Sequence, residues 1–386
     1  MTELKYGTNP HQRYAAMEPT LPGRWPVEVL NGTPSMINLL DALNGWQLVR
    51  ELRTALGREA AASFKHVSPA GAAIATPLDA ELRRAYDVEG RELSPAALAY
   101  VRARGADPKS SFGDFVALSH PVDVETAEFL KGVVSDGIVA PGYAPKALEL
   151  LKAKKSGAFL VMKADPDFEP PAREKREIFG LELVQDRNAH LVSRADLAKV
   201  VVGELTEAAI SDLVLGLVTL KYTQSNSVGY AAGGQMIGIG AGQQSRVDCT
   251  KLAGAKADTW QLGRHPKVLA LEFLPSVKRQ ERINFRIRYI EGDLTREEQA
   301  EFRAALAKPA EPLGDGEKRE FLSTVSGVSL VSDGFIPFRD NIDHAAKHGV
   351  RFIAEPGGSA RDPDVEAACR EYGIALVYTN LRLFHH

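Results

Sequence analysis

The sequence lacks the features that mark several classes of protein. It has only two cysteines, Cys249 and Cys369, with no partner spacing, so a disulfide framework and a cysteine-based zinc or iron–sulfur centre are excluded. Its longest apolar run, Leu213–Leu220, is far shorter than the roughly 20 residues of a membrane span, and Met1 does not open a signal peptide. We therefore expect a cytoplasmic protein that does not bind membranes.

No sign of charge dominates either. Lys and Arg total 47 against 50 Asp and Glu, a net charge of −3, so no overall basic field draws nucleic acid to the protein. The nine histidines form no HExxH motif, and no HxE precedes a PCxxC, which argues against a zinc protease and a zinc deaminase. No metal site is expected from the residues, and local groups must bind any anion.

The sequence does contain capped helical patterns that alternate with short β-rich runs, and this is typical of an α/β fold. Residues 41–56 predict an amphipathic helix, and 61–67 predict a strand that ends at a Ser-Pro-Ala-Gly turn, 68–71. Proline-first and glycine-last signals predict helices at 94–105 and 123–132. The expected fold class is therefore α/β.

The C-terminal part has the clearest pattern, a βαβαβ run. It predicts strands at 328–331, 351–354 and 374–378, and helices at 340–347 and 362–372. Strands connected in this way are normally parallel, and ligands lie beyond their carboxyl ends. Asp333, Phe335, Pro337 and Asn380 fall at such ends.

Two weak internal repeats suggest a duplication. The paired segments are 133–141 with 330–338, and 64–71 with 222–229. We therefore expect a first lobe at 1–170, a connector at 171–200 and a second lobe at 201–386. The highly charged stretch at 281–318 predicts a helical insertion in the second lobe.

Three segments could carry chemistry. Lys65 and His66, at the predicted strand end, pair a cation with a group that titrates near neutrality, or are a surface lysine beside a packing histidine. The glycines of 234–246 follow GxGxG and not GxGxxG, which argues against dinucleotide binding and favours a strand closely approached by backbone. Arg246 then offers a donor fork to an anion, or is simply exposed.

The third segment is 332–341, whose aromatics and proline suit a flat heteroaromatic ligand, or form a hydrophobic staple. The chain also ends abruptly at 381–386, directly after a predicted core strand. Because chain ends usually trail off into polar residues, we expect a docked and functional C-terminus.

Several irregular blocks, taken together, identify a family. They are Lys5–Gln12, Asn31–Pro34 with Ile37-Asn38, Ser63–Gly71, Ser110–Phe115, Lys221–Val228, Gly238–Arg246, Pro337–Asn341 and Asn380–His386. In this order they resemble the AICAR transformylase domain of the bifunctional purine-biosynthesis protein, over nearly the whole chain. The resemblance implies two tandem cytidine-deaminase-like α/β/α lobes with mixed sheets, which lack the deaminases' zinc ligands.

The same resemblance implies a folate-dependent reaction. The formyl group of 10-formyltetrahydrofolate passes to the 5-amino group of AICAR, giving FAICAR and tetrahydrofolate. By likeness, Lys65, His66 and Asn226 are the catalytic residues. A deactivated aromatic amine needs help to lose its proton while charge on the formyl oxygen is stabilised, and these three types can share that work in more than one way.

The resemblance also implies binding residues. The nucleotide side comprises Lys5, Tyr6, Asn38, Gly113, Asp136, Arg246, Phe335 and Arg382, and the folate side comprises Val247, Asn284, Pro337, Phe338, Asp340 and Asn341. The family's sites lie across a homodimer interface. A structural potassium ion near Thr223–Ser227 and Asp333 is a further expectation.

Two departures from the family pattern stand out. Lys5 replaces an arginine, exchanging a bidentate fork for a point charge, which would weaken or reshape nucleotide binding. Met1 lies four residues before Lys5, so a separate IMP cyclohydrolase is expected to perform ring closure. The alternatives are a non-catalytic AICAR- and folate-binding module, or an enzyme of this fold with another formyl donor, such as formate with ATP, although no GxxxxGK[ST] loop is present.

Overall fold

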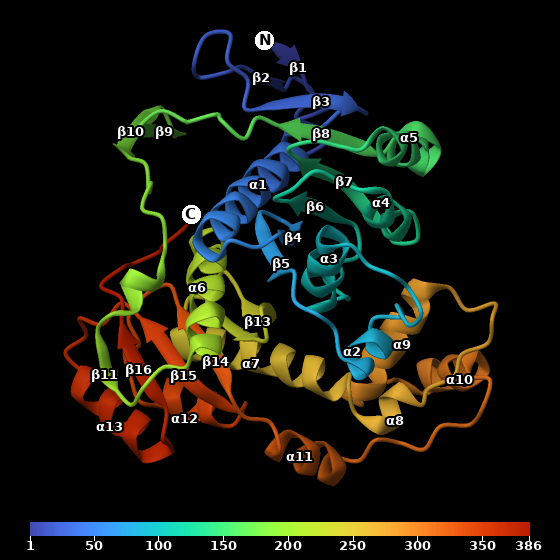
Figure 1. The fold of residues 1–386 in the computed structure, drawn as a ribbon, viewed down its shortest axis with the longest axis vertical. Helices are drawn as coiled ribbons and strands as arrows, with labels where there is room; N and C mark the ends of the chain where they lie inside the picture. Colours follow the sequence, from blue (N-terminus) through green and yellow to red (C-terminus); the bar gives the residue numbers. More distant parts are fainter.

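The computed structural model describes residues 1–386 as an α/β protein with thirteen α-helices around one large mixed sheet (Figure 1). The sheet has 12 strands in the order β11-β16-β15-β14-β12-β13-β5-β4-β6-β7-β8-β3. Its strands are β3 (Val27–Asn31), β4 (Ala60–Lys65), β5 (Ser68–Ile74), β6 (Asp114–Leu118), β7 (Ser135–Ala140), β8 (Leu160–Ala164), β11 (Val200–Val202), β12 (Val228–Ala232), β13 (Gln235–Gly240), β14 (Val328–Ser332), β15 (Val350–Glu355) and β16 (Ala375–Tyr378).

The helices lie in two layers. They are α1 (Met36–Leu56), α2 (Ala80–Ala85), α3 (Pro95–Gly105), α4 (Val124–Lys131), α5 (Pro145–Ala153), α6 (Glu207–Lys221), α7 (Arg246–Leu262), α8 (Pro266–Leu269), α9 (Arg279–Glu291), α10 (Arg296–Ala305), α11 (Asp315–Ser323), α12 (Asp340–Ala346) and α13 (Asp362–Tyr372). One face of the sheet is covered by α1 and α6, and the other by α3–α5, α7, α12 and α13.

The sheet consists of two halves with the same topology. In the first half β4 pairs antiparallel with β5 and β6, β6–β7–β8 are parallel, and β3 closes the edge antiparallel to β8. In the second half β12, β13, β14, β15, β16 and β11 repeat this pattern strand for strand. The halves join where β5 pairs with β13. The chain is therefore a structural duplication within one continuous sheet.

One glycine in each half shows the same close packing. A Cβ at Gly71 of β5 would lie 2.1 Å from the Ala103 carbonyl oxygen of α3, and a Cβ at Gly238 of β13 would lie 2.2 Å from the Ala253 carbonyl oxygen of α7. Only glycine fits so close to a helix backbone. This confirms the prediction that the alternating glycines of 234–246 form a strand with closely approaching backbone.

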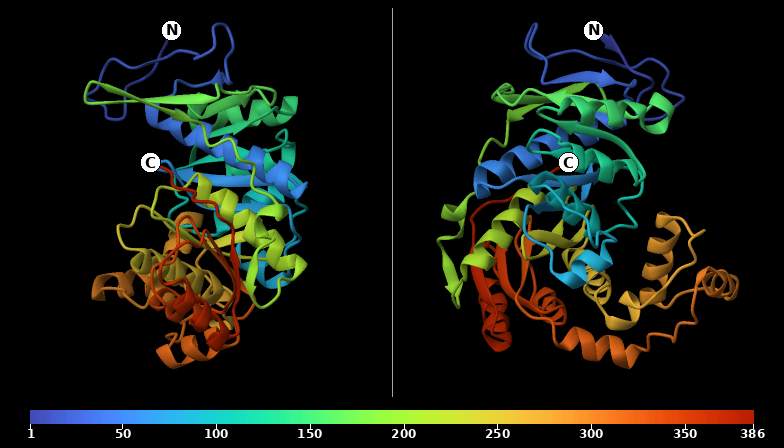
Figure 2. Two further views of the ribbon diagram at one scale, coloured as in Figure 1. Left: turned by 90° about the vertical axis from the view of Figure 1, so that its left-hand side faces the viewer. Right: turned by 45° about the vertical axis from the view of Figure 1, so that its right-hand side comes forward.

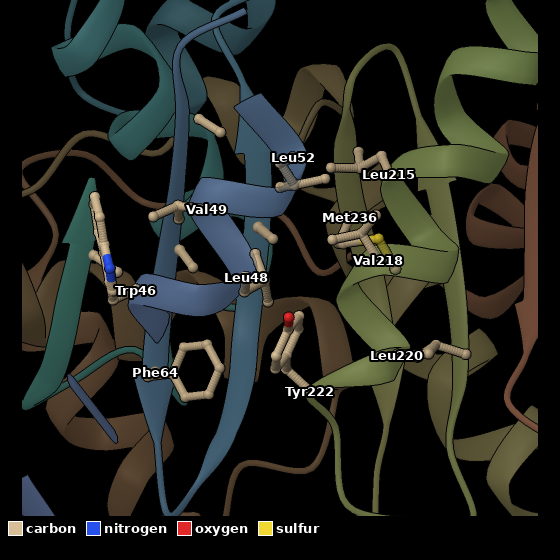
Figure 3. Close-up of a cluster of buried hydrophobic side chains, with 14 of the residues drawn as sticks. Trp46, Leu48, Val49, Leu52, Phe64, Leu215, Val218, Leu220, Tyr222 and Met236 are labelled. Carbon is tan, nitrogen blue, oxygen red and sulfur yellow. The ribbon is translucent and has the colours of Figure 1, made fainter. Parts of the chain in front are cut away.

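The largest hydrophobic core lies between α1 and α6, where the two halves meet (Figure 3). Leu48 and Leu52 of α1 face Leu215 and Val218 of α6 there. A buried ion pair joins the same helices, because Lys221 Nζ lies 2.8 Å from the carboxylate of Glu51. Apolar burial and one paired charge thus hold the halves together.

The structure confirms several of the predicted elements. The strands β14, β15 and β16 are parallel, and α12 and α13 connect them as expected. Helices α3 and α4 begin after the caps Ser94 and Asp123, whose side chains accept backbone N–H groups. The charged insertion is helical and comprises α9, α10 and α11, of which α10 and α11 lie at the outside of the molecule (Figure 2).

Other predictions were wrong. The first helix begins at Met36, not Asp41, because Ser35 and Asn38 form a capping box there. The chain turns at His66–Val67, and the predicted turn 68–71 belongs to β5. Pro69 and Gly71 misled the prediction, since proline also occurs at strand irregularities, such as the register shift beside Pro69, and glycine occurs where another backbone comes close, as α3 does at Gly71.

Both sequence repeats paired the wrong positions. Residues 135–137 open β7, whereas 332 ends β14 and 333–334 follow it, and β7 corresponds to β15 in the topology, not to β14. Residues 222–229 run from the end of α6 into the start of β12, whereas 64–71 run from the end of β4 into β5, and β4 corresponds to β12 in the topology. The segment expected to connect the lobes contains an exposed hairpin of β9 (Arg173–Ile178) and β10 (Leu181–Asp186). The lobe boundaries at 170 and 200 stay a prediction.

Two further strands, β1 (Thr2–Glu3) and β2 (Ala16–Met17), form a small separate sheet at the N-terminus. None of the helices combines the length and the apolar character needed to cross a membrane.

Candidate active site

Residues from both halves of the sheet lie along one of its edges, here the edge formed by the ends of the strands. Lys65 ends β4, Gly113 precedes β6 and Asp136 is the second residue of β7, all at the edge to which β4 runs. Because β14 runs antiparallel to β12, the start of β12 after Asn226 and the end of β14 before Phe335 reach that same edge. The first half contributes the amino ends of its parallel strands and the second half the carboxyl ends.

The Lys65–His66 pair lies on a two-residue hairpin between β4 and β5. His66 and Val67 both have positive φ, 53° and 61°, as a tight turn with left-handed central residues requires. Lys65 is half-buried and its ammonium donates to the Phe112 carbonyl oxygen. His66 is exposed. A lysine ammonium and an accessible imidazole are thus side by side at the edge of the sheet.

The carboxylate of Asp41, on α1, holds the His66–Val67 turn through a hydrogen bond. Asp41 of α1 is 8% exposed, and its Oδ1 accepts the Val67 N–H at 2.7 Å. Burial raises the pKa of Asp41 to about 6, although the Val67 N–H and the charges of His66 and Lys65 act in the opposite direction. The position of Lys65 and His66 therefore depends on a group on a different element.

The second half provides a buried cluster of charged and polar groups. The Arg246 guanidinium, at the start of α7, forms an ion pair with Asp333, which follows β14. It also donates to the Ser227 carbonyl oxygen at 3.0 Å and to Asn226 Oδ1 at 2.7 Å. Asn226 Nδ2 donates to the Gln243 carbonyl oxygen at 2.8 Å. Arg246 and Asn226 are thus fixed in one hydrogen-bonded unit.

This cluster corrects the expected arrangement of Arg246. It is 8% exposed, so it is not a simple surface arginine, and its donor fork is already partly engaged, because Nη1 donates to Ser227 and Asp333 and Nη2 donates to Asn226. The C-terminal segment packs against the same cluster, where Leu383 N–H donates to the Asp333 carbonyl oxygen at 2.8 Å. His385 N–H donates to Ser225 Oγ at 3.0 Å. The expected docking of the C-terminus is confirmed.

Comparison with known proteins shows which family the chain belongs to. The family model described as AICARFT/IMPCHase bienzyme matches residues 1–256, about two thirds of the chain. The chain belongs to this family.

Two curated relatives match over nearly its whole length, and each is named "Bifunctional purine biosynthesis protein PurH". The protein from Cereibacter sphaeroides is 30% identical over 386 residues, which is 99% of this chain and 59% of the relative. The protein from Oceanobacillus iheyensis is 29% identical over 388 residues, which is 100% of this chain and 59% of the relative. The chain thus spans 59% of the length of these AICARFT/IMPCHase relatives.

The first-half residues that the family pattern assigns to the nucleotide lie near the start of α1 or at the sheet edge. Tyr6 accepts the Met36 N–H through its carbonyl oxygen, and exposed Lys5 lies beside it. Asn38 accepts from Ser35 and so completes the helix cap. Gly113 has φ of 74°, and Asp136 forms an exposed ion pair with Lys155 at 2.7 Å.

The remaining residues expected on the nucleotide side, and those expected on the folate side, lie in the second half of the chain. Phe335 and Phe338 are 48% and 56% exposed, which is unusual for phenylalanine and leaves two aromatic faces open beside Pro337. Exposed Arg382 stacks on Phe384, with its guanidinium carbon 4.9 Å from the ring centroid. Val247 is half-buried in the first turn of α7.

Two of the folate residues are engaged within the chain and one lies elsewhere. Buried Asn341 accepts from Thr250 Oγ1 at 3.0 Å and donates to Asp340 at 2.9 Å. Asn284 lies on the exposed side of α9 in the insertion, where it accepts from Gln280 at 3.0 Å. Asn284 forms no hydrogen bond with the Pro337–Asn341 turn.

The sheet order sets how far apart the two groups are within one chain. The strand that carries Asp136, β7, is six strand positions away from β14, which leads to Phe335. At about 4.8 Å per position, this separates them by about 29 Å along the edge. Lys65 and Asn226 are closer, since β4 and β12 are three strand positions apart, about 14 Å by the same spacing. The Gln224 N–H also donates to Ser68 Oγ at 3.3 Å across this gap. One chain therefore brings the expected catalytic residues nearer to one another than the outermost residues expected to bind the nucleotide.

The sequence-based reasoning missed the supporting residues Asp41 and Phe112. Asp41 resembles any acidic residue on an amphipathic helix, and Phe112 acts through its backbone carbonyl, which no side-chain pattern reports. A left-handed His66-Val67 turn was equally invisible, because no glycine marks it and a β-branched valine strongly disfavours positive φ.

Proposed function

We propose that this chain transfers the formyl group of 10-formyltetrahydrofolate to the 5-amino group of AICAR, giving FAICAR and tetrahydrofolate. The Lys65–His66 turn carries this proposal, because it presents an ammonium and an imidazole at the edge where the Asn226–Arg246–Asp333 cluster also lies. Membership of the AICARFT/IMPCHase family and the names of the PurH relatives support it.

The proposed chemistry has two bond changes. The amine nitrogen of AICAR attacks the formyl carbon, and the bond from that carbon to the folate nitrogen breaks. Exposed His66 takes the proton that the amine loses and delivers it to the folate nitrogen as that nitrogen leaves. Lys65, fixed against the Phe112 carbonyl, stabilises the negative charge that develops on the formyl oxygen.

Asn226 has a positioning role in this scheme. Its oxygen accepts from Arg246 and its nitrogen donates to the Gln243 and Gln244 carbonyls, at 2.8 and 3.2 Å. With its donors occupied, Asn226 orients the Arg246 guanidinium towards an anion or carboxamide of the nucleotide. The open rings of Phe335 and Phe338 offer apolar faces to the flat ring systems of the two substrates.

A homodimer completes the proposed site. Asp136 and Phe335 are about 29 Å apart in one chain by strand spacing, too far to contact one nucleotide. A second chain that faces this edge would supply Phe335 and Arg382 to the Lys65–Asp136 side of the first chain. Two equivalent sites per dimer then follow from the symmetry.

The loop before β12 suits the structural potassium ion expected from the family. The Ser227 hydroxyl is buried with no hydrogen-bond partner, and it lies beside Asp333, which accepts the Ser227 N–H at 2.9 Å. Ser225, Ser227 and Asp333 would hold the ion through oxygen, the ligand atom that potassium prefers. A bound ion would stiffen this loop, and no step of the transfer runs through it.

The cytoplasmic location also stays a prediction.

The test is AICAR-dependent formation of tetrahydrofolate from 10-formyltetrahydrofolate, followed by absorbance with the purified chain. His66→Ala and Lys65→Ala are expected to lower kcat by at least about a hundredfold, the usual size of a general acid–base contribution. The matched control is His120→Ala, since His120 follows β6 at the opposite edge and should keep full activity. AICAR binding without turnover in the native dimer would refute the enzyme and favour a binding module.

A further inference from the structure

A cavity of about 460 Å³ lies where the loop after α3 meets α7 and α9, and its lining includes Ser110, two residues before the Phe112 whose carbonyl oxygen accepts from Lys65. This volume is within the range of pockets that bind small molecules. None of the expected folate residues lines it, and Asn284 is on the other, exposed side of α9. The proposed formyl transfer therefore gives this cavity no role.

The cavity walls are mainly apolar and partly aromatic. Phe129 and Trp260 contribute rings from α4 and α7. Ile283 and Ile287 of α9 are spaced four residues apart, so they lie on one face of the helix. The Trp260 Nε1–H is already bonded to the Tyr86 hydroxyl at 2.8 Å, which leaves the indole ring as an apolar surface. Such walls suit a flat aromatic body.

One positive charge in the cavity has no acidic partner. Arg279, four residues before Ile283 on the same face of α9, donates from Nη2 to the Tyr86 carbonyl oxygen at 2.8 Å. Its Nε is buried without a hydrogen-bond partner, and its guanidinium carbon lies 5.2 Å from the centre of the Phe129 ring. A buried, unpaired donor of this kind costs free energy that an acceptor would recover.

The other basic side chains around the cavity are neutralised. Their ion pairs are Arg104–Asp114 at 2.7 Å, Lys109–Glu291 at 3.3 Å, Lys256–Asp107 at 3.0 Å, Arg264–Glu81 at 2.8 Å and Arg286–Asp87 at 3.0 Å. Only the Arg279 guanidinium is left to attract an anion. A planar guanidinium in an apolar setting is matched best by a carboxylate, which it can bind through two parallel hydrogen bonds.

We propose that this cavity is a second binding site, which takes a small aromatic carboxylate with its carboxylate on Arg279 and its ring against Phe129 and Trp260. The ligand class follows from one unpaired guanidinium among apolar and aromatic walls. Binding here requires neither AICAR nor folate, so the site can be tested whether or not the chain transfers formyl groups.

The probes are 2-naphthoate and its uncharged analogue 2-naphthamide, titrated calorimetrically into the whole chain with and without saturating AICAR. We expect one 2-naphthoate per chain, bound about tenfold or more tightly than 2-naphthamide, because a charge-assisted hydrogen bond has roughly that worth. Arg279→Gln should reduce the affinity for 2-naphthoate to that of the amide. Arg282→Gln is the matched control, since Arg282 is on the same helix but outside the cavity lining.

Ile283→Trp provides a second test that keeps the charge and fills the space, and it should abolish binding of both probes. Thermal denaturation checks that each variant is folded. If Arg279→Gln does not fold, Ile283→Trp alone tests the proposal. Equal affinity for acid and amide, or unchanged binding by both variants, would overturn the proposal. Displacement of 2-naphthoate by AICAR would also overturn it, because the probe would then lie in the active site. Loss of binding as chain concentration rises would overturn it too, because a second copy of the chain would then fill the cavity.

Discussion

Replacing Asp41 should disconnect the Lys65–His66 turn from α1. His66 and Val67 are held at φ of 53° and 61°, a backbone conformation that costs non-glycine residues about 1–3 kcal/mol each. The Asp41 carboxylate accepts the Val67 N–H at 2.7 Å and thereby helps to hold that conformation. Without an acceptor, the turn is free to relax and to move both side chains.

The magnitude follows from that hydrogen bond. Asp41→Ala leaves the Val67 N–H without its partner, a loss of about 1–3 kcal/mol. If this loss falls on the transition state, kcat/KM for formyl transfer drops about 5- to 150-fold. Asp41→Asn keeps an oxygen at the same place, so its kcat/KM should stay within a few fold of the native value. Steady-state kinetics of both variants measures the difference.

Asp41 should also make the free energy of unfolding depend on pH, and here its ionisation lowers stability. Burial raises the pKa of Asp41 from 3.8 to about 6, a shift of about two units that corresponds to about 3 kcal/mol. Because the folded-state pKa is raised, the contribution of this group is complete below pH 3.8 and is lost as the pH rises through 6. Asp41→Asn cannot ionise, so its free energy of unfolding should exceed the native value increasingly from pH 4 to 7.

Urea denaturation of the native protein and Asp41→Asn across this pH range isolates the group, since all other ionisations are common to both. A difference that does not change with pH would refute the burial argument. An Asp41→Ala variant with native kcat/KM would refute the argument that Asp41 positions the turn.

Three further predictions concern packing and assembly. Gly238→Ala should lower the free energy of unfolding by about 1–3 kcal/mol or more in urea denaturation, because its Cβ would meet the α7 backbone at 2.2 Å. Lys221→Met should cost about 3–5 kcal/mol in the same assay, since the Glu51 charge stays buried and unpaired. Mixing inactive Asp136→Ala and Arg382→Ala chains should restore roughly a quarter of native activity if sites are shared between chains, and none if each chain builds its own.

Local signals in the sequence predicted much of the fold. The C-terminal βαβαβ run was predictable because glycines at 349 and 373 and the cap near Asp362 bound its elements. The joining of the two halves through β5 and β13 was not, because β5 is rich in alanine and glycine, β13 contains two glycines, and neither strand carries a pairing signal. The repeat was inferred correctly from misaligned segments, since the topology recurs while the sequence has diverged.

The candidate site was predictable only in part. Family motifs named Lys65, His66 and Arg246, but no motif indicates that Arg246 pairs with Asp333, 87 residues away, or that Asn226 has its donors occupied. Such contacts depend on tertiary structure. They decide whether a side chain reaches the substrate or supports one that does.

The most direct measurement follows the formyl carbon itself. The purified chain is given AICAR and 10-formyltetrahydrofolate that carries ¹³C in the formyl group, and the products are identified by mass spectrometry. We expect the label in the ribonucleotide product, at a rate that falls by at least about a hundredfold in the Lys65→Ala, His66→Ala double variant. Label that stays on the folate while AICAR is bound, or equal transfer by the double variant, would contradict the proposal that this sheet edge catalyses formyl transfer.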